Sequence, residues 1–257
     1  MPTILIVEGN TAEFMRETGS AGGAMPFVRE IHAIAPEFSF KLVYPYESPL
    51  KSDDLQGISG AIFTGAGVNW STDAPEAQPL RDAMITVFDA GIPTWGSCNG
   101  LQLAATVLGG TVGASPNGLE VGMARNLTPT RAAETHPMMA GRTAPYAVPC
   151  VHRDEVQTLP DGSVLMAGNA HSPIQAFAYE QNGIRFWGTQ YHPELRAADI
   201  AGFFAARDGI FADEADMAPD LAIAEQDPAA AARIGTSPDE LATNNRTREL
   251  SNWVKSL

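Results

Sequence analysis

The feature of this sequence that most constrains its fold is an alternation of short apolar runs with segments of helical character. Four runs of strand length occur in the first hundred residues, at 3–8, 39–44, 60–65 and 92–97. The segment 75–91 has helical character and lies between the last two runs. Strands spaced by helices are joined by crossover connections, which produce a largely parallel sheet with helices on both faces. We therefore expect an α/β fold with such a central sheet.

The second half of the chain contains a region rich in predicted strands, followed by an acidic stretch. Residues 119–190 look richer in strand, because apolar runs are separated by turn signals such as LPDG and QNG. A helix is expected over 195–209, and residues 211–230 then contain six acidic residues and no basic residue. This shift in composition predicts a boundary, with a main domain at 1–208 and an acidic linker plus a C-terminal helical extension at 209–257.

The C-terminal extension carries a signal for the start of a helix and an apolar face. Ser237 fits the N-cap position, Pro238 the first helical position and Glu240 the third, which together form a capping-box pattern. Four apolar residues then fall on one face: Leu250, Trp253, Val254 and Leu257. We expect one C-terminal helix that packs back on the main domain.

Composition and charge narrow the class of protein. The chain has 257 residues, 44% of them hydrophobic, which is typical of a globular protein. Its net charge of -14, without a concentrated basic patch, predicts no nucleic-acid partner and no membrane surface. The apolar run near the N-terminus is too short for a secretory signal. Two cysteines, Cys98 and Cys150, are too few for a disulfide framework and lack the paired spacing of a zinc site, so we expect a cytoplasmic protein. We expect no metal and no cofactor.

The stretch TWGSCNGLQ places Cys98 where an apolar run gives way to a segment of helical spacing. Gly96 and Gly100 flank it in a G-x-C-x-G pattern. This pattern is typical of a nucleophile elbow, in which small flanking residues let a strand and a helix approach while the central side chain is pushed out. The alternative is that the two glycines serve the turn and that Cys98 is merely a small apolar residue within it.

A second stretch, FWGTQYHPE, supplies the partners that a cysteine nucleophile needs. His192 provides a base that can take and return a proton, and Glu194 provides a carboxylate to orient it. Pro193 interrupts the strand between them, so the two side chains can be directed around a corner. Taken alone, a histidine near an acidic residue is more often part of a surface turn.

Together these stretches resemble a known family. GSCNGLQ followed by GTQYHPE resembles the class I (triad) glutamine amidotransferase domain, and the intervening VHRDEVQTLPDGSVLMAGN is similar to the H-x-D-x-V-x-x-L-P stretch of members like the glutaminase part of GMP synthase. The resemblance spans about residues 1–208 and implies a flavodoxin-like fold. It also implies that Cys98 is the nucleophile, His192 the acid and base, and Glu194 the carboxylate that orients the imidazole. A cysteine α/β-hydrolase shares the elbow, but it usually draws its acid from a separate loop before the histidine.

The resemblance also implies an oxyanion hole. The first oxyanion loop of the family reads S-G-G-P, whereas this chain has the sequence TGAG at 64–67. Because backbone amides can still serve there, the resemblance implies that the amides of Ala66 and Asn99 form the hole and that Gly65 supplies the turn.

Further positions match residues that lie near the substrate in the family. Gln102 matches a glutamine that contacts the bound glutamine, and the alternative is a solvent-facing helix residue. His152 and Asp154 match the stretch that flanks the pocket, and the alternative is that both are plain loop residues. Gly65, Gln102, His152 and Asp154 are therefore the predicted substrate-binding residues.

The implied reaction is acyl transfer from a small-molecule γ-glutamyl substrate, either glutamine or another γ-glutamyl amide. The chain is expected to be a free-standing hydrolase, similar to γ-glutamyl hydrolases of this fold, because no nucleotide fingerprint follows residue 208. One alternative is a glutaminase subunit that delivers ammonia to a synthase partner. Another alternative, from a different class, is an inactive binding or regulatory protein.

The glycine-rich segment 10–26 bears on the choice between these functions. It follows the first strand, where a short connection would suffice, and strand ends of this kind are where ligands bind in open α/β folds. We expect it to overhang Cys98 as a lid and to contribute to the pocket for the amine. The alternative is a surface loop that does not contact the substrate.

Overall fold

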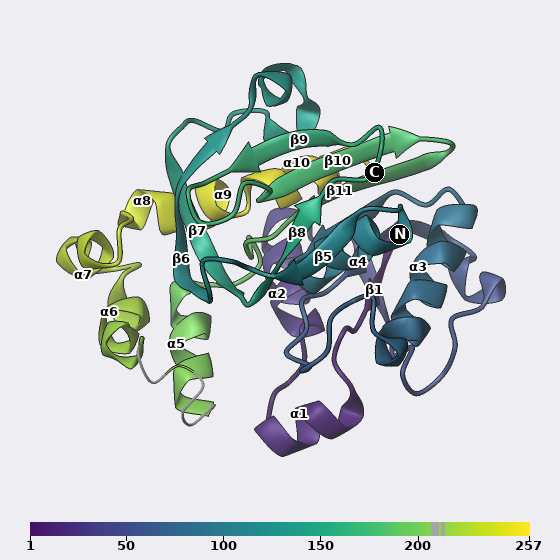
Figure 1. Ribbon diagram of the computed structural model, residues 1–257, viewed down its shortest axis with the longest axis horizontal. Helices are drawn as coiled ribbons and strands as arrows, with labels where there is room; N and C mark the ends of the chain where they lie inside the picture. Colours follow the sequence, from purple (N-terminus) through teal and green to yellow (C-terminus); the bar gives the residue numbers. More distant parts are fainter. Residues whose placement is uncertain (207–210, 212–213) are drawn as a thin grey trace.

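The computed structural model describes residues 1–206, 211 and 214–257, and the described chain is built around a nine-stranded sheet (Figure 1). In sheet order, the strands are β2 (Ser39–Val43), β1 (Thr3–Val7), β3 (Ile58–Phe63), β4 (Thr94–Ser97), β11 (Ile184–Thr189), β10 (Ala176–Gln181), β9 (Val164–Gly168), β6 (Glu120–Pro129) and β7 (Tyr146–His152). The pairs from β2 to β11 are parallel and the others are antiparallel. β5 (Thr111–Ala114) and β8 (Asp154–Thr158) form a separate antiparallel pair.

The parallel strands are covered by helices on both faces. In β1, Ile4 and Ile6 point to one side and Leu5 and Val7 to the other, and all four are fully buried. The first side packs against α2 (Ala24–Ile34) and α10 (Arg248–Lys255), and the second against α3 (Gln78–Asp89) and α4 (Asn99–Val107). The expected α/β fold, with a largely parallel central sheet and helices on both faces, is confirmed.

The remaining helices lie outside these two layers. α1 (Ala12–Thr18) projects at the lower edge of the molecule in Figure 1, and α5 (Ala197–Ala206) lies at the left. The helix expected over 195–209 begins at Ala197, and the last residues of that range lie outside the described part of the chain. Short 3-10 helices are found at Ser52–Leu55, Pro75–Ala77, Arg131–Thr135, Pro137–Met139 and Ala215–Met217.

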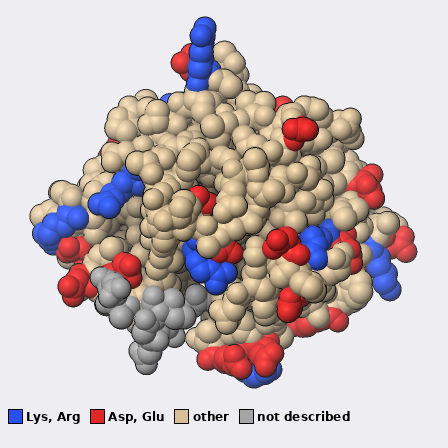
Figure 2. All heavy atoms as spheres, in the orientation of Figure 1, with Lys and Arg blue, Asp and Glu red and all other residues tan. Residues whose placement is uncertain are grey.

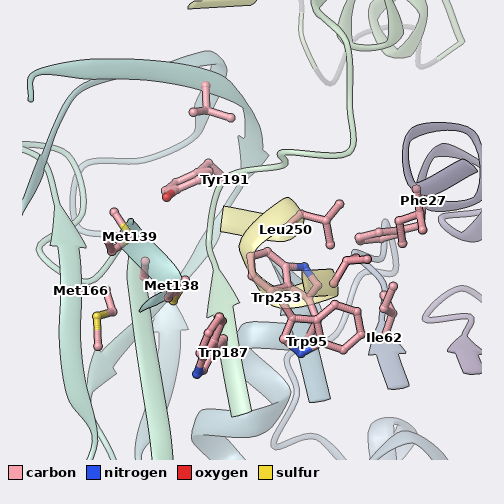
Figure 3. Close-up of a cluster of buried hydrophobic side chains, with 14 of the residues drawn as sticks. Phe27, Ile62, Trp95, Met138, Met139, Met166, Trp187, Tyr191, Leu250 and Trp253 are labelled. Carbon is pink, nitrogen blue, oxygen red and sulfur yellow. The ribbon is translucent and has the colours of Figure 1, made fainter. Parts of the chain in front are cut away.

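The larger core lies between the sheet on one side and α2, α10 and the short helices of 131–139 on the other (Figure 3). Trp95 of β4 and Trp253 of α10 are both buried, and their ring centroids are 6.3 Å apart. Leu250 of the same helix is fully buried in this core, together with Phe27 from α2. The C-terminal helix therefore packs on the strand that leads into Cys98.

The single C-terminal helix expected from the sequence is divided into three. α8 (Pro238–Leu241) and α9 (Thr243–Arg246) precede α10, and the first break falls at Ala242, whose ψ of 140° is extended. Threonine and asparagine follow this break, and their side chains compete with helical hydrogen bonding. The capping box is half formed, because Ser237 accepts from the backbone N–H of Glu240 but the Glu240 carboxylate accepts from Thr236.

The segment expected to be an acidic linker also contains helices. α6 (Ala218–Ile223) and α7 (Pro228–Arg233) occupy much of it, and Asp227 caps α7 by accepting from the N–H groups of Ala229 and Ala230. Leu221 and Ala231 are fully buried, so apolar residues among the acidic ones decide the structure here. The expected boundary at 208/209 lies outside the described residues.

The surface agrees with the acidic composition. Figure 2 shows the Lys and Arg side chains of the visible face scattered among Asp and Glu rather than gathered in a patch. Among the described residues, no helix is long and apolar enough to cross a bilayer.

Candidate active site

Polar and reactive groups gather where four neighbouring parallel strands end. Glu8 follows β1, the loop 64–67 follows β3, Cys98 follows β4, and the segment 190–194 follows β11. Ligands in open α/β sheets bind outside the carboxyl ends of the strands. The candidate active site lies at this edge.

Cys98 occupies a strained turn between β4 and α4. Its φ of 52° and ψ of -107° form a backbone conformation that residues other than glycine rarely adopt. A Cβ on Gly96 would lie 2.6 Å from the carbonyl carbon of Gly100, and a Cβ on Gly100 would overlap the carbonyl oxygen of Phe63. Both glycines are therefore needed for the close approach of strand and helix, which is the geometry of a nucleophile elbow.

His192 and Glu194 lie beside this turn. Nδ1 of His192 is 2.7 Å from Oε1 of Glu194, and both side chains are buried. Gly65 adjoins both His192 and Cys98, since a Cβ at Gly65 would lie 2.7 Å from Cε1 of His192 and 3.6 Å from the Cβ of Cys98. The structure thus brings together the three residue types of a nucleophile, a base and an orienting carboxylate.

The charge state of His192 follows from its two neighbours. Burial by itself lowers the pKa of His192, but the Glu194 carboxylate and the Cys98 side chain outweigh it and raise this pKa to about 10. The imidazolium therefore predominates near neutral pH. Among the described residues, Nε2 of His192 has no hydrogen-bond partner. The proton on Nε2 can therefore be given to a leaving group at Cys98.

Glu194 has a second partner that the sequence analysis missed. The hydroxyl of Ser97 donates to Oε2 of Glu194 at 3.0 Å, and the indole N–H of Trp95 donates to the same Ser97 oxygen at 3.0 Å. This chain of hydrogen bonds fixes the second oxygen of the carboxylate while the first meets His192. In the sequence, the only indication of this role for Ser97 is its position next to Cys98.

The backbone amides predicted to form an oxyanion hole belong to the same edge. Asn99 is the first residue of α4, so its N–H has no acceptor within the helix. Ala66 lies between Gly65, which adjoins the cysteine, and Gly67, whose N–H donates to Oδ1 of Asn10 at 2.8 Å. Their joint action on an oxyanion remains a prediction.

Sequence comparison places the chain in a family. A profile of the family Glutamine amidotransferase class-I matches residues 35–201. The chain belongs to the class I glutamine amidotransferases. It is 34% identical over 212 residues to a gamma-glutamyl-L-1-hydroxyisopropylamide hydrolase from a Pseudomonas species, and this match covers 78% of this chain and 70% of the relative. It is 32% identical over 170 residues to a GMP synthase [glutamine-hydrolyzing] from Heliobacterium modesticaldum, covering 66% of this chain and 29% of the synthase.

Solved structures show the same fold. A glutamine amidotransferase from Thermotoga maritima superposes with a TM-score of 0.68 at 17% identity, covering 99% of this chain and 97% of the other. A glutamine amido transferase from Methylobacillus flagellatus gives a TM-score of 0.64 at 20% identity, covering 100% and 95%. The resemblance noted in the sequence, and the fold it implied, are confirmed.

In this class I amidotransferase, Gln102 is part of the structure behind the elbow. It is buried, so the alternative of a solvent-facing helix residue is wrong. Its side-chain amide donates to the backbone oxygen of Asp154 at 2.7 Å and to Oε1 of Gln190 at 3.0 Å. Contact between Gln102 and a substrate stays a prediction.

His152 and Asp154 are likewise held by protein groups. Nδ1 of His152 is 3.1 Å from the backbone oxygen of Asp154, and Nε2 is 2.8 Å from Oε2 of Glu120. The Asp154 carboxylate accepts from Arg153 at 2.8 and 3.2 Å. These contacts brace the turn between β7 and β8. Val151 lies just before this turn, within β7, and its carbonyl is 3.6 Å from Sγ of Cys98. Their role in substrate binding also stays a prediction.

Among the described residues, three side chains form a group that could hold a metal ion, with candidate ligand atoms within 4.8 Å of one another: Glu120, His152 and His171. The three residues lie far apart in the chain, so no local pattern in the sequence predicts this cluster. The Glu120 oxygens already accept from His152, from Gln175 at 2.6 Å and from Asn169 at 2.7 Å. Burial alone raises the pKa of Glu120, but its hydrogen-bond partners, His152 foremost, together outweigh burial and lower it. Through these bonds, Glu120 links β6 to the end of β7 and to the segment 169–175.

Proposed function

We propose that this amidotransferase hydrolyses a γ-glutamyl amide whose amine is larger than ammonia, through a thioester on Cys98 and without a synthase partner. The observation that carries the proposal is the buried group of Cys98, His192 and Glu194 at a strained strand-to-helix turn. The 34% identical relative, which is named as a hydrolase of a γ-glutamyl hydroxyisopropylamide, supports the class of substrate.

The reaction proceeds in two halves. The Cys98 thiolate adds to the amide carbonyl, and the N–H groups of Asn99 and Ala66 stabilise the oxyanion. The C–N bond then breaks as His192 gives its Nε2 proton to the departing amine, which leaves a γ-glutamyl thioester. Neutral His192 next takes a proton from water, which attacks the thioester, releases glutamate and restores the thiolate and imidazolium. Glu194 keeps the imidazole in place through both halves.

The segment 10–26 supports a binding site for a larger amine. Asn10 accepts from the N–H of Gly67 at 2.8 Å, and the Glu8 carboxylate accepts from the N–H of Ala24 at 3.0 Å. Both ends of the segment are thus attached at the edge that carries the oxyanion loop, while α1 projects beyond it (Figure 1). We place the amine pocket beneath this segment.

Steady-state kinetics of the purified protein test the proposal. We expect kcat/KM for an aliphatic γ-glutamyl amide, such as the isopropylamide, to exceed that for glutamine by about tenfold or more. The reason is that glutamine releases only ammonia and leaves the proposed amine pocket unfilled, so it forgoes the binding energy of that pocket. The hydrolase proposal fails if no γ-glutamyl amide is turned over faster than glutamine and activity rises only when a synthase is added.

The second candidate, a glutaminase that supplies ammonia, has its own supporting observation. The chain matches GMP synthases, although it spans only 29% of the length of the first of these relatives. Glutamine would then be the preferred substrate, and the same kinetics distinguish the two functions. The third candidate, an inactive binding protein, requires that no acyl-enzyme mass be detected with any γ-glutamyl substrate.

A further inference from the structure

A buried arginine from the C-terminal helices reaches the turn between the proposed base and its carboxylate. Arg246, the last residue of α9, is 1% exposed. Its Nη1 donates to the carbonyl oxygen of Pro193 at 2.6 Å, and its Nη2 donates to Oε2 of Glu30 on α2 at 2.7 Å. Pro193 is the residue between His192 and Glu194. The guanidinium thus connects the peptide group of this turn to a helix on one face of the sheet.

The chemistry of these groups explains why an arginine is suited to this place. Burying a guanidinium is costly unless it is paired, so a side chain that only filled space would be apolar. Proline has no N–H, so the carbonyl is the one polar backbone group that Pro193 itself offers to a partner. The planar fork of Arg246 directs two donors in fixed directions, one to this carbonyl and one to the fully buried Glu30.

Glu30 also supports the next peptide of the turn. Its Oε1 accepts from Arg29 at 2.7 Å and from Arg196 at 3.0 Å. Arg29 in turn donates from Nη2 to the backbone oxygen of Glu194 at 3.2 Å. Burial by itself raises the pKa of Glu30, but Arg246 and its neighbours outweigh burial and lower it, so this carboxylate stays charged. The carbonyl before Glu194 and the carbonyl of Glu194 itself therefore each accept a hydrogen bond from an arginine, and both arginines also donate to Glu30.

We infer that Arg246 and Glu30 are positioning residues that hold the backbone of Pro193 and Glu194 so that the Glu194 carboxylate meets His192. The inference rests on the proposed function only in taking His192 and Glu194 as the base and its orienting carboxylate. It makes the C-terminal helices a part of the hydrolytic machinery as well as a cover for the core.

Arg246→Lys tests the inference, because an ammonium keeps the charge but cannot reproduce the two fixed directions of the fork. We expect kcat to fall by about ten- to a hundredfold while KM changes less than about twofold, since small displacements of a catalytic group have effects of this size. The groups that raise the pKa of His192 are the Glu194 carboxylate and the Cys98 side chain. A displaced Glu194 raises the pKa of His192 less, so the alkaline limb of the kcat profile should move to lower pH.

Arg142→Lys is the matched control. The side chain of Arg142 is also largely buried and donates from Nε and Nη2 to Glu249 of α10, at 2.7 and 2.5 Å, without contacting the turn at 193. The variant Arg142→Lys should lower the melting temperature, as Arg246→Lys does. It should nevertheless keep kcat within about twofold of the wild-type value and leave the alkaline limb of the kcat–pH profile unchanged. Equal losses of kcat in the two variants, or an unchanged kcat and limb in Arg246→Lys, would overturn the inference.

Two further measurements keep the test decisive. If Arg246→Lys does not accumulate in folded form, Glu30→Gln replaces it, with the same expected signature and the same contradicting result. The kcat and KM of each variant are compared with the wild-type values on whichever of the two substrates, glutamine or the larger amide, the wild type hydrolyses faster. A preference for glutamine would therefore contradict the proposed substrate but leave this test intact. If the wild type hydrolyses neither, the proposed function fails. The rate at which a glutamine-analogue diazo-ketone labels Cys98 then takes the place of kcat.

Discussion

At the scale of single residues, the two cysteines have opposite surroundings. Cys98 stands at a strained turn beside an imidazolium, whereas Cys150 lies in β7 and is fully buried in the larger core. Burial raises the pKa of the Cys150 thiol well above its ordinary value, which keeps it protonated and unreactive. The difference between the two thiols is therefore one of position and electrostatics.

We expect Cys98→Ala to lower kcat by about four orders of magnitude or more, because it removes the nucleophile, and Cys150→Ala to keep kcat within about twofold. A glutamine-analogue diazo-ketone should label one cysteine only, as read by mass mapping. Label found on Cys150 would contradict the assignment.

Glu194→Gln separates orientation from proton transfer. An amide keeps the shape but loses the charge that raises the pKa of His192, so we expect turnover to fall by about tenfold to a thousandfold while the acyl-enzyme still forms. His192→Ala should cost more. Intact mass measurement after mixing with substrate detects the thioester, and equal, total loss in both variants would show that Glu194 has another role.

At the scale of elements, the elbow depends on how closely β3, β4 and α4 approach one another. A side chain at residue 100 would overlap the Phe63 carbonyl of β3, so a glycine is required at the start of α4. Gly202 of α5 offers the contrast, because no described atom outside its own stretch of helix lies within 4 Å of a Cβ built there. A backbone contact thus requires glycine at position 100, whereas no described neighbour requires it at position 202.

Gly100→Ala is expected to lower the free energy of unfolding by about 2 kcal/mol or more and to abolish activity, because the overlap is with backbone and cannot be relieved by a rotamer. Gly202→Ala should instead stabilise the protein by about 0.5–1 kcal/mol, since alanine favours the helix. Denaturant unfolding measures both changes. A tolerated Gly100→Ala with normal activity would contradict the described elbow.

At the scale of the whole molecule, stability depends on pH through groups whose pKa changes on folding. The pKa values of Glu30 and Glu120 are lowered, so their contribution is present above the ordinary carboxyl value of 4.5 and is lost as the pH falls through the lower folded values. The pKa of His192 is raised from 6.5 to about 10, so its contribution is complete below 6.5 and is lost as the pH rises through 10.

We therefore expect the melting temperature to decline between pH 6.5 and 10 in the wild type and to decline less in His192→Gln, which removes the group that titrates there. Thermal unfolding followed by circular dichroism at a series of pH values measures the two slopes. Parallel slopes in the two proteins would show that the imidazolium of His192 does not stabilise the fold over this range.

Much of the site could be read from the sequence because its information is local. The elbow needs two glycines within five residues, and the base and its carboxylate lie two residues apart, so both patterns are visible in short stretches. Strand and helix periodicity likewise predicted the central sheet, because burial on both faces leaves continuous apolar runs. The three-way division of the C-terminal helix was not predicted, because the apolar face alone does not show where the backbone leaves the helix.

What only the tertiary structure decided is which distant residues support the site. Arg246 and Pro193, or Ser97 and Glu194, meet across long separations in the chain, and no local pattern marks one as the partner of the other. Gln102 shows the same limit, because its position on a helix did not reveal that the fold buries it against Asp154. The sequence by itself determined the chemistry of the reacting groups. Packing determined the network that orients them, because it arises only when separate elements come together.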